Sequence, residues 1–386
     1  MTVVAPPQRS LPDALLRPVQ TTVAPTSPSA AAIPRPAPRV APATTATRPS
    51  RADGSGGFAM RSVFPVQAIA RCTSADEGIL ASVTPLQRYI AEEIATDHVD
   101  GLLSRREALR RLALIGVGAT AATALIAACG DGKKPTADAP VTSTGGATVE
   151  KGPPPGSENT VASEPITWAG PQGELQGAWA PAQNPKGAVL VVHENKGLND
   201  WVRSVAGRFA GIGYSSIAID LLSAKGGTAT FSDPAQATAE LSKIPPEEFV
   251  ANLKSGVGEL QRRTPGVKVA AVGFCMGGGL VWQLLASGEP QLAAAVPFYG
   301  PLPDGADFSG SKDVAVLGFY GAKDARVTGT KDAAQQALDK AGLVNQLVVE
   351  PDADHAFFND TGERYDPTAA ADAWQRVQDW FTKYVG

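Results

Sequence analysis

A short apolar segment, a glycine-flanked turn and a helix follow one another at residues 267–286, and this succession constrains the fold most strongly. Residues 267–272 are mainly apolar, residues 273–277 read Gly-Phe-Cys-Met-Gly, and residues 280–286 favour a helix. A strand that turns sharply into a closely packed helix needs glycine beside the turn, because a Cβ there would clash. The central residue is Cys275. Considered by itself, this cysteine could simply be a small buried apolar side chain without a catalytic role.

The stretch 161–386 has the pattern of one α/β domain. A short antiparallel pair is predicted at 166–168 and 175–179, followed by apolar strands separated by helices. The further strands are predicted at 188–193, 216–220, 292–299, 314–320 and 346–350, and the helices at 201–209, 247–261, 329–342 and 366–384. Near-continuous apolar strands that alternate with helices predict a mostly parallel sheet with helices on both faces.

The segments before this domain differ sharply in composition. Residues 1–58 consist almost entirely of Ala, Pro, Thr, Ser, Val and Arg, so we expect residues 1–82 to be disordered. Residues 130–160, rich in Gly, Pro and Thr, are predicted to be a flexible linker. The net charge of −4 and the pI of about 5.6 give no electrostatic reason to expect a nucleic-acid partner.

Residues 83–129 combine features of an export signal. Arg105 and Arg106 follow Ser104 and resemble a twin-arginine motif, an apolar stretch covers residues 112–128, and Cys129 ends a sequence similar to a lipobox. We therefore predict an exported protein that is held at the membrane by a lipid on Cys129 or by an uncleaved signal helix, and a cytoplasmic one if the signal is not used. The apolar stretch is short for a membrane span, and a buried Ala-rich helix is the alternative.

Export signals stand near the start of a chain, whereas this one lies far inside it. We therefore expect translation to start later, at Val83 or at Met60. Peptides from residues 1–58 in the native precursor would contradict this expectation.

Histidine and cysteine are scarce, which limits the catalytic arrangements that are possible. The three cysteines, Cys72, Cys129 and Cys275, show no paired spacing typical of a disulfide framework or a zinc site. Of the three histidines, His98, His193 and His355, only the last follows Cys275. A nucleophilic thiol needs a base, and His355 is thus its candidate.

His355 follows the predicted strand 346–350, and Asp324 follows the predicted strand 314–320. The carboxyl ends of parallel strands meet at one edge of a sheet, so we expect a Cys275–His355–Asp324 triad there, in the chain order nucleophile, acid, histidine. Asp352 and Asp354 are competing carboxylates, but they stand too near His355 in a tight loop to orient its ring well.

The oxyanion of an acyl-transfer reaction needs preorganised donors. The candidates are the backbone N–H of Met276, directly after the nucleophile, and that of Asn195, in the loop after strand 188–193. Glu194 stands beside this candidate site, where an unpaired carboxylate is costly. It either has a role in the site or forms a salt bridge with Arg203 or Lys196.

Four motifs together resemble the dienelactone hydrolase family: residues 192–198 (VHENKGL), 273–278 (GFCMGG), 321–324 (GAKD) and 354–357 (DHAF). The resemblance implies an α/β-hydrolase fold, no metal or cofactor, and hydrolysis of enol-lactones such as 4-carboxymethylenebut-2-en-4-olide to maleylacetate. It implies Cys275 as nucleophile, His355 as base and Asp324 as its orienter. Glu194 matches the family carboxylate that interacts with the thiol and helps to generate the thiolate.

The sequence departs from the family beyond the histidine. Well-known members carry an arginine there for the substrate carboxylate, whereas here no arginine occurs before Arg364. We therefore expect a less acidic small ester or lactone, held against an apolar wall of Phe357 and Phe358. The leading prediction is an exported Cys-His-Asp hydrolase that acts through a thioester. The alternatives are a lipoprotein that binds a small ligand without turnover, and a redox thiol, which the lack of a resolving cysteine disfavours.

Overall fold

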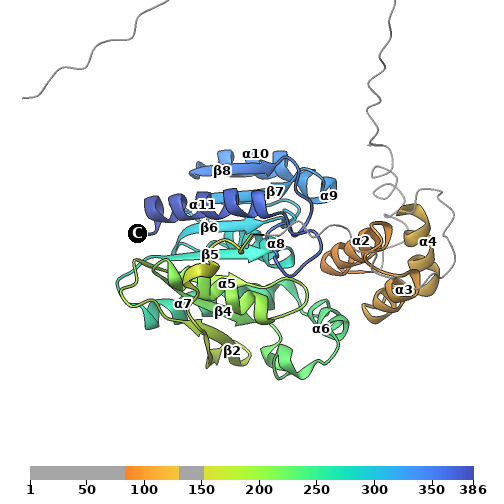
Figure 1. Ribbon diagram of the computed structural model, residues 1–386, viewed down its shortest axis with the longest axis horizontal. Helices are drawn as coiled ribbons and strands as arrows, with labels where there is room; N and C mark the ends of the chain where they lie inside the picture. The colour runs from red at the N-terminus through yellow and green to blue at the C-terminus, as the bar shows by residue number, and fades with distance from the viewer. Residues whose placement is uncertain (1–82, 130–151) are drawn as a thin grey trace, which may run out of the picture. The chain divides into compact units, whose positions relative to one another are not determined.

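The structure is a computed structural model that describes residues 83–129 and 152–386 (Figure 1). The predicted disordered segment 1–82 and most of the predicted linker, residues 130–151, lie outside the described residues.

The domain is built on one eight-stranded sheet with the order β1-β2-β4-β3-β5-β6-β7-β8 (Figure 1). The antiparallel part is β1, β2 and their junction with β4, and all remaining neighbours are parallel. The predicted α/β fold with a mostly parallel sheet is thus confirmed. The strands are β1 (Glu164–Gly170), β2 (Gly173–Ala180), β3 (Gly187–Val192), β4 (Tyr214–Asp220), β5 (Val269–Phe274), β6 (Leu292–Phe298), β7 (Ala315–Gly321) and β8 (Asn345–Glu350).

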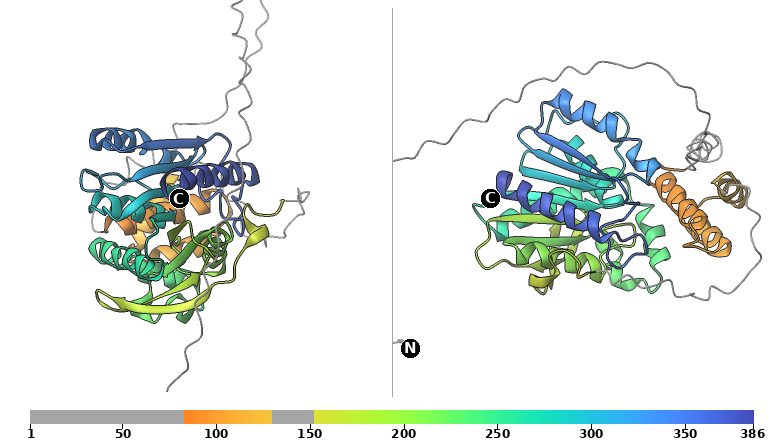
Figure 2. Two further views of the ribbon diagram at one scale, coloured as in Figure 1. Left: turned by 90° about the vertical axis from the view of Figure 1, so that its left-hand side faces the viewer. Right: turned by 45° about the horizontal axis from the view of Figure 1, so that its top comes forward.

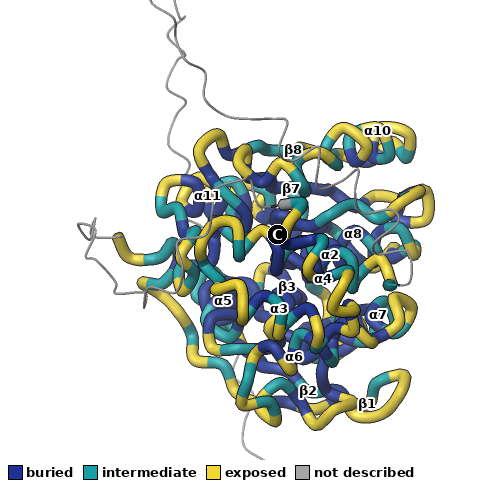
Figure 3. The backbone as a smooth tube through the Cα atoms, turned by 90° about the vertical axis from the view of Figure 1, so that its right-hand side faces the viewer, coloured by how far each residue is buried: buried dark blue, intermediate teal, exposed yellow. Residues whose placement is uncertain are grey.

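Helices cover both faces of the sheet, which is why the central strands are apolar throughout. α5 (Asp200–Gly211) and α11 (Pro367–Tyr384) lie on one face, and α7 (Pro246–Arg263), α8 (Met276–Ala286) and α10 (Lys331–Ala341) lie on the other (Figure 3). Every residue of β3 and β5 is buried between these layers. On the first face the Phe209 ring packs on Trp374 and Phe381, with centroids 5.0 and 5.7 Å away.

The sequence prediction missed two short helices and extended the linker too far. α6 (Pro234–Leu241) and α9 (Ala325–Thr328) were not predicted. The predicted linker ends at residue 160, yet a side chain at Gly156 would overlap the Trp374 ring, and Val161 N–H donates to Gly207 O at 3.0 Å. The last residues of this segment therefore pack against α5 and α11.

Three helices precede the α/β domain: α2 (Pro85–Val99), α3 (Arg105–Leu114) and α4 (Ala119–Cys129) (Figure 1). α2 begins with a capping box between Thr84 and Gln87, which satisfies the free N–H groups of its first turn. The three helices contact one another and bury a shared apolar core that includes Ile90, Leu112 and Leu125.

The apolar stretch 112–128, which belongs to the predicted signal or anchor segment, is divided between two helices in the structure. α3 ends at Leu114 and α4 begins at Ala119, because Gly116 adopts a φ of +88°, which interrupts helical geometry. Arg105 and Arg106 lie exposed at the start of α3. Among the described residues, no helix combines the length and the hydropathy that a membrane crossing requires.

Glu350, at the end of β8, makes the folding stability depend on pH. It is 5% exposed, and burial together with the Asp372 carboxylate raises its pKa from 4.5 to about 7. Between these pH values the unfolded chain ionises and the folded chain does not, so folding stability falls as the pH rises from about 4.5 to about 7.

We therefore expect Glu350→Gln to raise the unfolding free energy at pH 8 by about 1–2 kcal/mol, and to change it little at about pH 4.5. Thermal unfolding followed by circular dichroism at both pH values measures this, with Asp332→Asn on α10 as an exposed control. An equal gain at both pH values would contradict the assigned cause.

Candidate active site

Cys275 occupies a strained turn between β5 and α8. Its φ of 55° and ψ of −119° are unusual for a residue with a side chain, and its N–H donates to Phe298 O at 3.1 Å. A Cβ at Gly273 would overlap Gly277 O, and a Cβ at Gly277 would overlap Val192 O. Both glycines are therefore needed for the turn, and they let α8 start against the end of β3.

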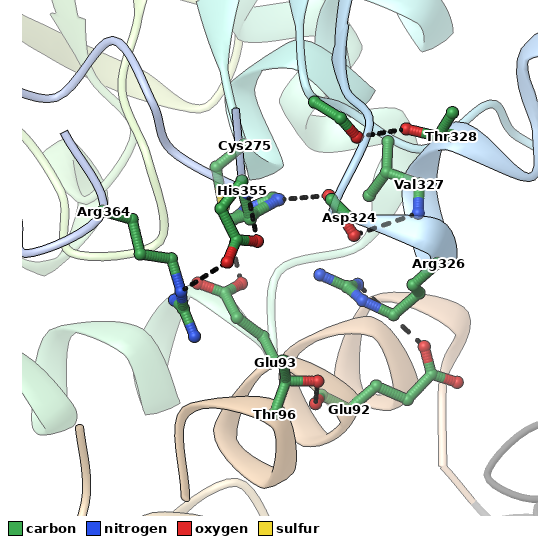
Figure 4. A network of polar contacts seen from close by, with 12 residues as sticks. Glu92, Glu93, Thr96, Cys275, Asp324, Arg326, Val327, Thr328, His355 and Arg364 are labelled. Carbon is green, nitrogen blue, oxygen red and sulfur yellow. Dashed lines mark hydrogen bonds and ion pairs between the residues drawn. The ribbon is translucent and has the colours of Figure 1, made fainter. Parts of the chain in front are cut away.

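His355 and Asp324 form a buried pair near this turn. Asp324 follows β7 and His355 follows β8, and these strands are neighbours in the sheet. Their loops are joined by a hydrogen bond from Lys323 N–H to Ala353 O at 3.0 Å. The Nδ1 of His355 lies 2.6 Å from Asp324 Oδ2, and neither residue is more than 7% exposed (Figure 4).

The pKa values of this pair follow from burial and from their mutual attraction. Burial alone would lower the pKa of His355, but the Asp324 carboxylate outweighs burial and raises it well above its usual value. Conversely, burial opposes ionisation of Asp324, while His355 holds the pKa of Asp324 below its usual value. Asp324 therefore orients the ring and stabilises the imidazolium that forms when His355 takes up a proton.

The thiol of Cys275 lies close to this imidazole ring. Cys275 Sγ and a ring nitrogen of His355 lie within 4.8 Å of one another. Nδ1 is taken by Asp324, and Nε2 is buried with no hydrogen-bond partner in the described part of the chain. The structure thus brings Cys275, His355 and Asp324 together with the free ring nitrogen available to the thiol.

The groups hydrogen-bonded to the thiol come from α2, which sequence reasoning did not foresee. Cys275 Sγ donates to Glu93 Oε2 at 3.4 Å (Figure 4). It also lies 3.4 Å from the hydroxyl of Tyr89. Burial and the Glu93 carboxylate raise the pKa of Cys275, against the opposing effect of His355. The resting thiol is therefore held neutral.

Glu194 lies nearby but does not bond to the thiol. Its Oε2 accepts a hydrogen bond from Asn359 Nδ2 at 2.8 Å, and its Oε1 is buried without a partner among the residues described. Burial raises the pKa of Glu194, only partly offset by the Lys196 charge. The alternative salt bridge with Arg203 or Lys196 does not form within the described ranges.

His193 fixes the loop that carries Glu194 and Asn195. Leu221 N–H donates to Nε2 of His193 at 3.2 Å, so its proton resides on Nδ1, which donates to Glu194 O at 2.6 Å. Burial lowers the pKa of His193, which keeps the ring neutral. Asn195 follows β3, Met276 follows β5, and these strands are adjacent, so both candidate oxyanion residues lie at the same edge of the sheet.

A cavity of about 290 Å³ opens onto the thiol and the imidazole. Its lining is mostly polar and charged, and it includes Glu93, Lys196 and Arg364. The prediction of an apolar wall is wrong, since Phe357 and Phe358 are fully buried in the core, where Phe358 stacks on Phe274 with centroids 5.5 Å apart. Arg364, the first arginine after the histidine, does reach the cavity.

One group of side chains in the described ranges could hold a metal ion. Glu93, Cys275 and His355 each offer an atom, and these three atoms lie within 4.8 Å of one another. The donor set suits a thiophilic ion such as Zn²⁺. Such an ion would occupy the candidate nucleophile and base, so it would block their chemistry rather than assist it.

Comparisons with known proteins agree with this fold. The dienelactone hydrolase family profile matches residues 176–385. A protein of Escherichia coli (strain K12), provisionally named carboxymethylenebutenolidase, is 33% identical over 217 residues, which cover 53% of this chain and 80% of that protein. A similarly named protein of Methylorubrum extorquens is 31% identical over 218 residues, covering 53% and 75% respectively.

Two solved structures share the fold. One, provisionally described as a dienelactone hydrolase from Klebsiella pneumoniae, has 32% identity and a TM-score of 0.51. Another, described as a dienelactone hydrolase-like promiscuous phosphotriesterase from metagenomic libraries, has 27% identity and a TM-score of 0.52. Each match covers 58% of this chain and 100% of the other. The chain thus belongs to the dienelactone hydrolase family.

Proposed function

We propose that this chain hydrolyses small esters or lactones by nucleophilic catalysis at Cys275, with His355 as base and Asp324 as the residue that orients it. The observation that carries this proposal is the buried 2.6 Å contact between His355 Nδ1 and Asp324 Oδ2, which leaves Nε2 unpaired among residues 83–129 and 152–386, in a ring that has a nitrogen within 4.8 Å of the thiol. Family membership supports a hydrolase that acts on a small molecule.

In the proposed reaction, His355 Nε2 takes the proton of the Cys275 thiol as the sulfur attacks the acyl carbon. The tetrahedral oxyanion accepts hydrogen bonds from the N–H groups of Asn195 and Met276. Its collapse breaks the ester C–O bond, and the imidazolium protonates the leaving alkoxide. Water, deprotonated by His355, then attacks the thioester, which releases the acid and restores the thiol.

Glu194 is proposed to assist formation of the thiolate once a substrate is bound. It is buried, its Oε1 lacks a hydrogen-bond partner within the described ranges, and burial raises its pKa, which makes it a stronger base than an exposed glutamate. The charged cavity, with Lys196 and Arg364 in its lining, supports a substrate that carries polar or acidic groups beside the scissile bond.

We expect Glu194→Gln to lower kcat/KM about 10- to 100-fold and to leave the fold intact, because glutamine can still accept the Asn359 hydrogen bond. Steady-state hydrolysis of p-nitrophenyl acetate across pH 5–9 measures the loss and the change in the pH profile. The exposed Glu174→Gln on β2 serves as the control. An unchanged rate and profile would remove Glu194 from the mechanism.

Residues 83–129 are proposed to direct export, with Arg105 and Arg106 as the twin-arginine pair and Cys129 as the lipidated residue. The exposure of both arginines supports their availability to a receptor. Radiolabelled palmitate incorporation into wild type and Cys129→Ala, expressed in a bacterium that processes lipoproteins, tests the anchor. Equal labelling of both proteins would contradict it.

The proposed activity is tested by turnover of p-nitrophenyl acetate and of a small lactone by the purified full-length protein. We expect wild type to exceed Cys275→Ala for both substrates and to release an initial burst of p-nitrophenolate as the acyl-enzyme accumulates. Equal rates, together with saturable binding of an ester analogue, would instead support the ligand-binding protein without turnover.

A further inference from the structure

α2 presents one polar stripe toward the active site. Tyr89, Glu93 and Asp97 stand four residues apart, so they lie along one side of the helix. Ile90 and Ile94 are buried in the apolar core. Each of the three side chains of the stripe forms a hydrogen bond to a residue of the active-site region, and Figure 4 shows Glu93 reaching toward Cys275 and His355.

Glu93 occupies the space that an acyl group must enter. Its carboxylate accepts from the thiol at 3.4 Å and lies within 4.8 Å of both the sulfur and a ring nitrogen of His355. A scissile carbonyl must approach the sulfur to about 3–3.5 Å before attack. A carboxylate is also what ester hydrolysis leaves behind, so Glu93 stands where a product acid would. With α2 in place, Cys275 is only 2% exposed.

Ion pairs at the far end of the stripe hold α2 in this position. Arg364 Nη1 lies 2.7 Å from Asp97 Oδ1, and Arg364 Nη2 lies 2.6 Å from Asp100 Oδ2. Arg364 also lines the cavity, so these aspartates neutralise a cation that would otherwise face a substrate.

A second set of contacts holds the other end of the stripe. α9, which carries Arg326, lies beside α2 (Figure 2). The guanidinium of Arg326 lies 4.4 Å from the centre of the Tyr89 ring. It also lies 4.0 Å from Glu92 (Figure 4). Farther along, Arg110 of α3 pairs with Asp233, the N-cap of α6, at 2.8 Å.

We propose that α2 is an intramolecular inhibitor whose Glu93 carboxylate fills the acyl subsite as a product mimic while Tyr89 covers the thiol. This inference rests on the proposed nucleophilic role of Cys275. The carboxylate of Glu93 also opposes formation of the thiolate, so the closed form is protected both sterically and electrostatically. Cleavage at Cys129, the proposed lipidation point, would sever the covalent link between α2 and the hydrolase domain.

The test uses the full-length chain and two independent readouts. The first is the rate at which iodoacetamide alkylates Cys275, mapped by peptide mass spectrometry so that Cys72 and Cys129 are counted separately. The second is kcat/KM for p-nitrophenyl acetate. The variants are Glu93→Ala, Glu93→Gln and the double substitution Asp97→Asn with Asp100→Asn. Thr96→Ala is the matched control, because within the described ranges the Thr96 hydroxyl donates to its own helix at Glu92 O.

We expect Glu93→Ala and the double variant to raise both rates about tenfold or more, and Thr96→Ala to leave both unchanged. Glu93→Gln keeps the shape of the side chain and removes its charge. It should therefore shift the pH dependence of the Cys275 alkylation rate toward lower pH. The groups that face the thiol and shape this profile are Glu93 and Tyr89 on α2, Glu194 after β3 and His355 after β8. The double variant removes two partly buried ion pairs of Arg364, so its folding is checked by circular dichroism.

Three outcomes are distinguishable. If Glu93→Ala and the double variant are alkylated faster but no variant hydrolyses the ester, α2 does cover Cys275 and the proposed function is overturned. If the protein hydrolyses the ester but Glu93→Ala and the double variant change neither the alkylation rate nor the turnover, the inhibitory role of α2 is overturned and the proposed function is not. Hydrolysis that falls in Glu93→Ala while alkylation does not rise would also overturn the inhibitor, because α2 would then complete the site.

Discussion

Replacing Cys275 by alanine is expected to lower kcat/KM for p-nitrophenyl acetate by roughly 10⁴-fold or more, because no other group stands at the elbow to accept the acyl group. Cys275→Ser should also be severely impaired. The hydroxyl ionises far less readily than a thiol, and the site already opposes ionisation through burial and Glu93.

Cys72→Ala is the control for the loss of a thiol elsewhere in the chain, and it should retain wild-type turnover. Each variant is best measured in the Glu93→Ala background as well, so that closure by α2 does not hide the difference. Turnover by Cys275→Ala at the wild-type rate would show that Cys275 is not the nucleophile.

Asp324→Asn is expected to lower kcat/KM about 10²- to 10⁴-fold while the protein stays folded. The amide cannot stabilise an imidazolium, and it can hold the ring in the wrong tautomer. The substitution should also lower the pKa of His355, because the attraction that raises this pKa comes from Asp324. Asp324 Oδ1 also accepts from Val327 N–H at 3.3 Å as the cap of α9, a role that asparagine can keep.

Asp352→Asn is the matched control, since Asp352 is a competing carboxylate in the sequence next to His355. It should retain turnover close to that of wild type, and the pH–rate profile should shift only in Asp324→Asn. A large loss in Asp352→Asn with none in Asp324→Asn would show that the orienting carboxylate had been misassigned.

The fold and the convergence of the three side chains could be predicted because their signals are local. Continuous apolar strands indicate a buried parallel sheet, and the residues after successive strands meet at one edge. Asp324 follows β7 and His355 follows β8, so neighbouring strands bring them together whatever the rest of the chain does.

The direction of the Phe357 and Phe358 side chains could not be predicted from their nearness to His355. Ala356 adopts a φ of 61°, a left-handed conformation that redirects the chain directly after the histidine. The two rings consequently enter the core, and the charged side chains of more distant segments line the cavity instead.

Tyr89 and Glu93 carried no local signal of a role in the site. The hydrogen bond from Cys275 to Glu93 joins residues 182 positions apart and belonging to separate helical and α/β segments. The apolar composition of residues 112–128 suits both an export signal and the buried face of a small helical bundle. Composition therefore could not distinguish a segment that is cleaved off from one that packs over the active site.

The most direct test of the central claim is to quench the reaction with p-nitrophenyl acetate and to locate the acetyl group by peptide mass spectrometry, in wild type and in Glu93→Ala. The account predicts an acetyl group on Cys275, labile to hydroxylamine, in both proteins. Rapid turnover with the acetyl group on another side chain, or with full activity after complete alkylation of Cys275, would contradict it.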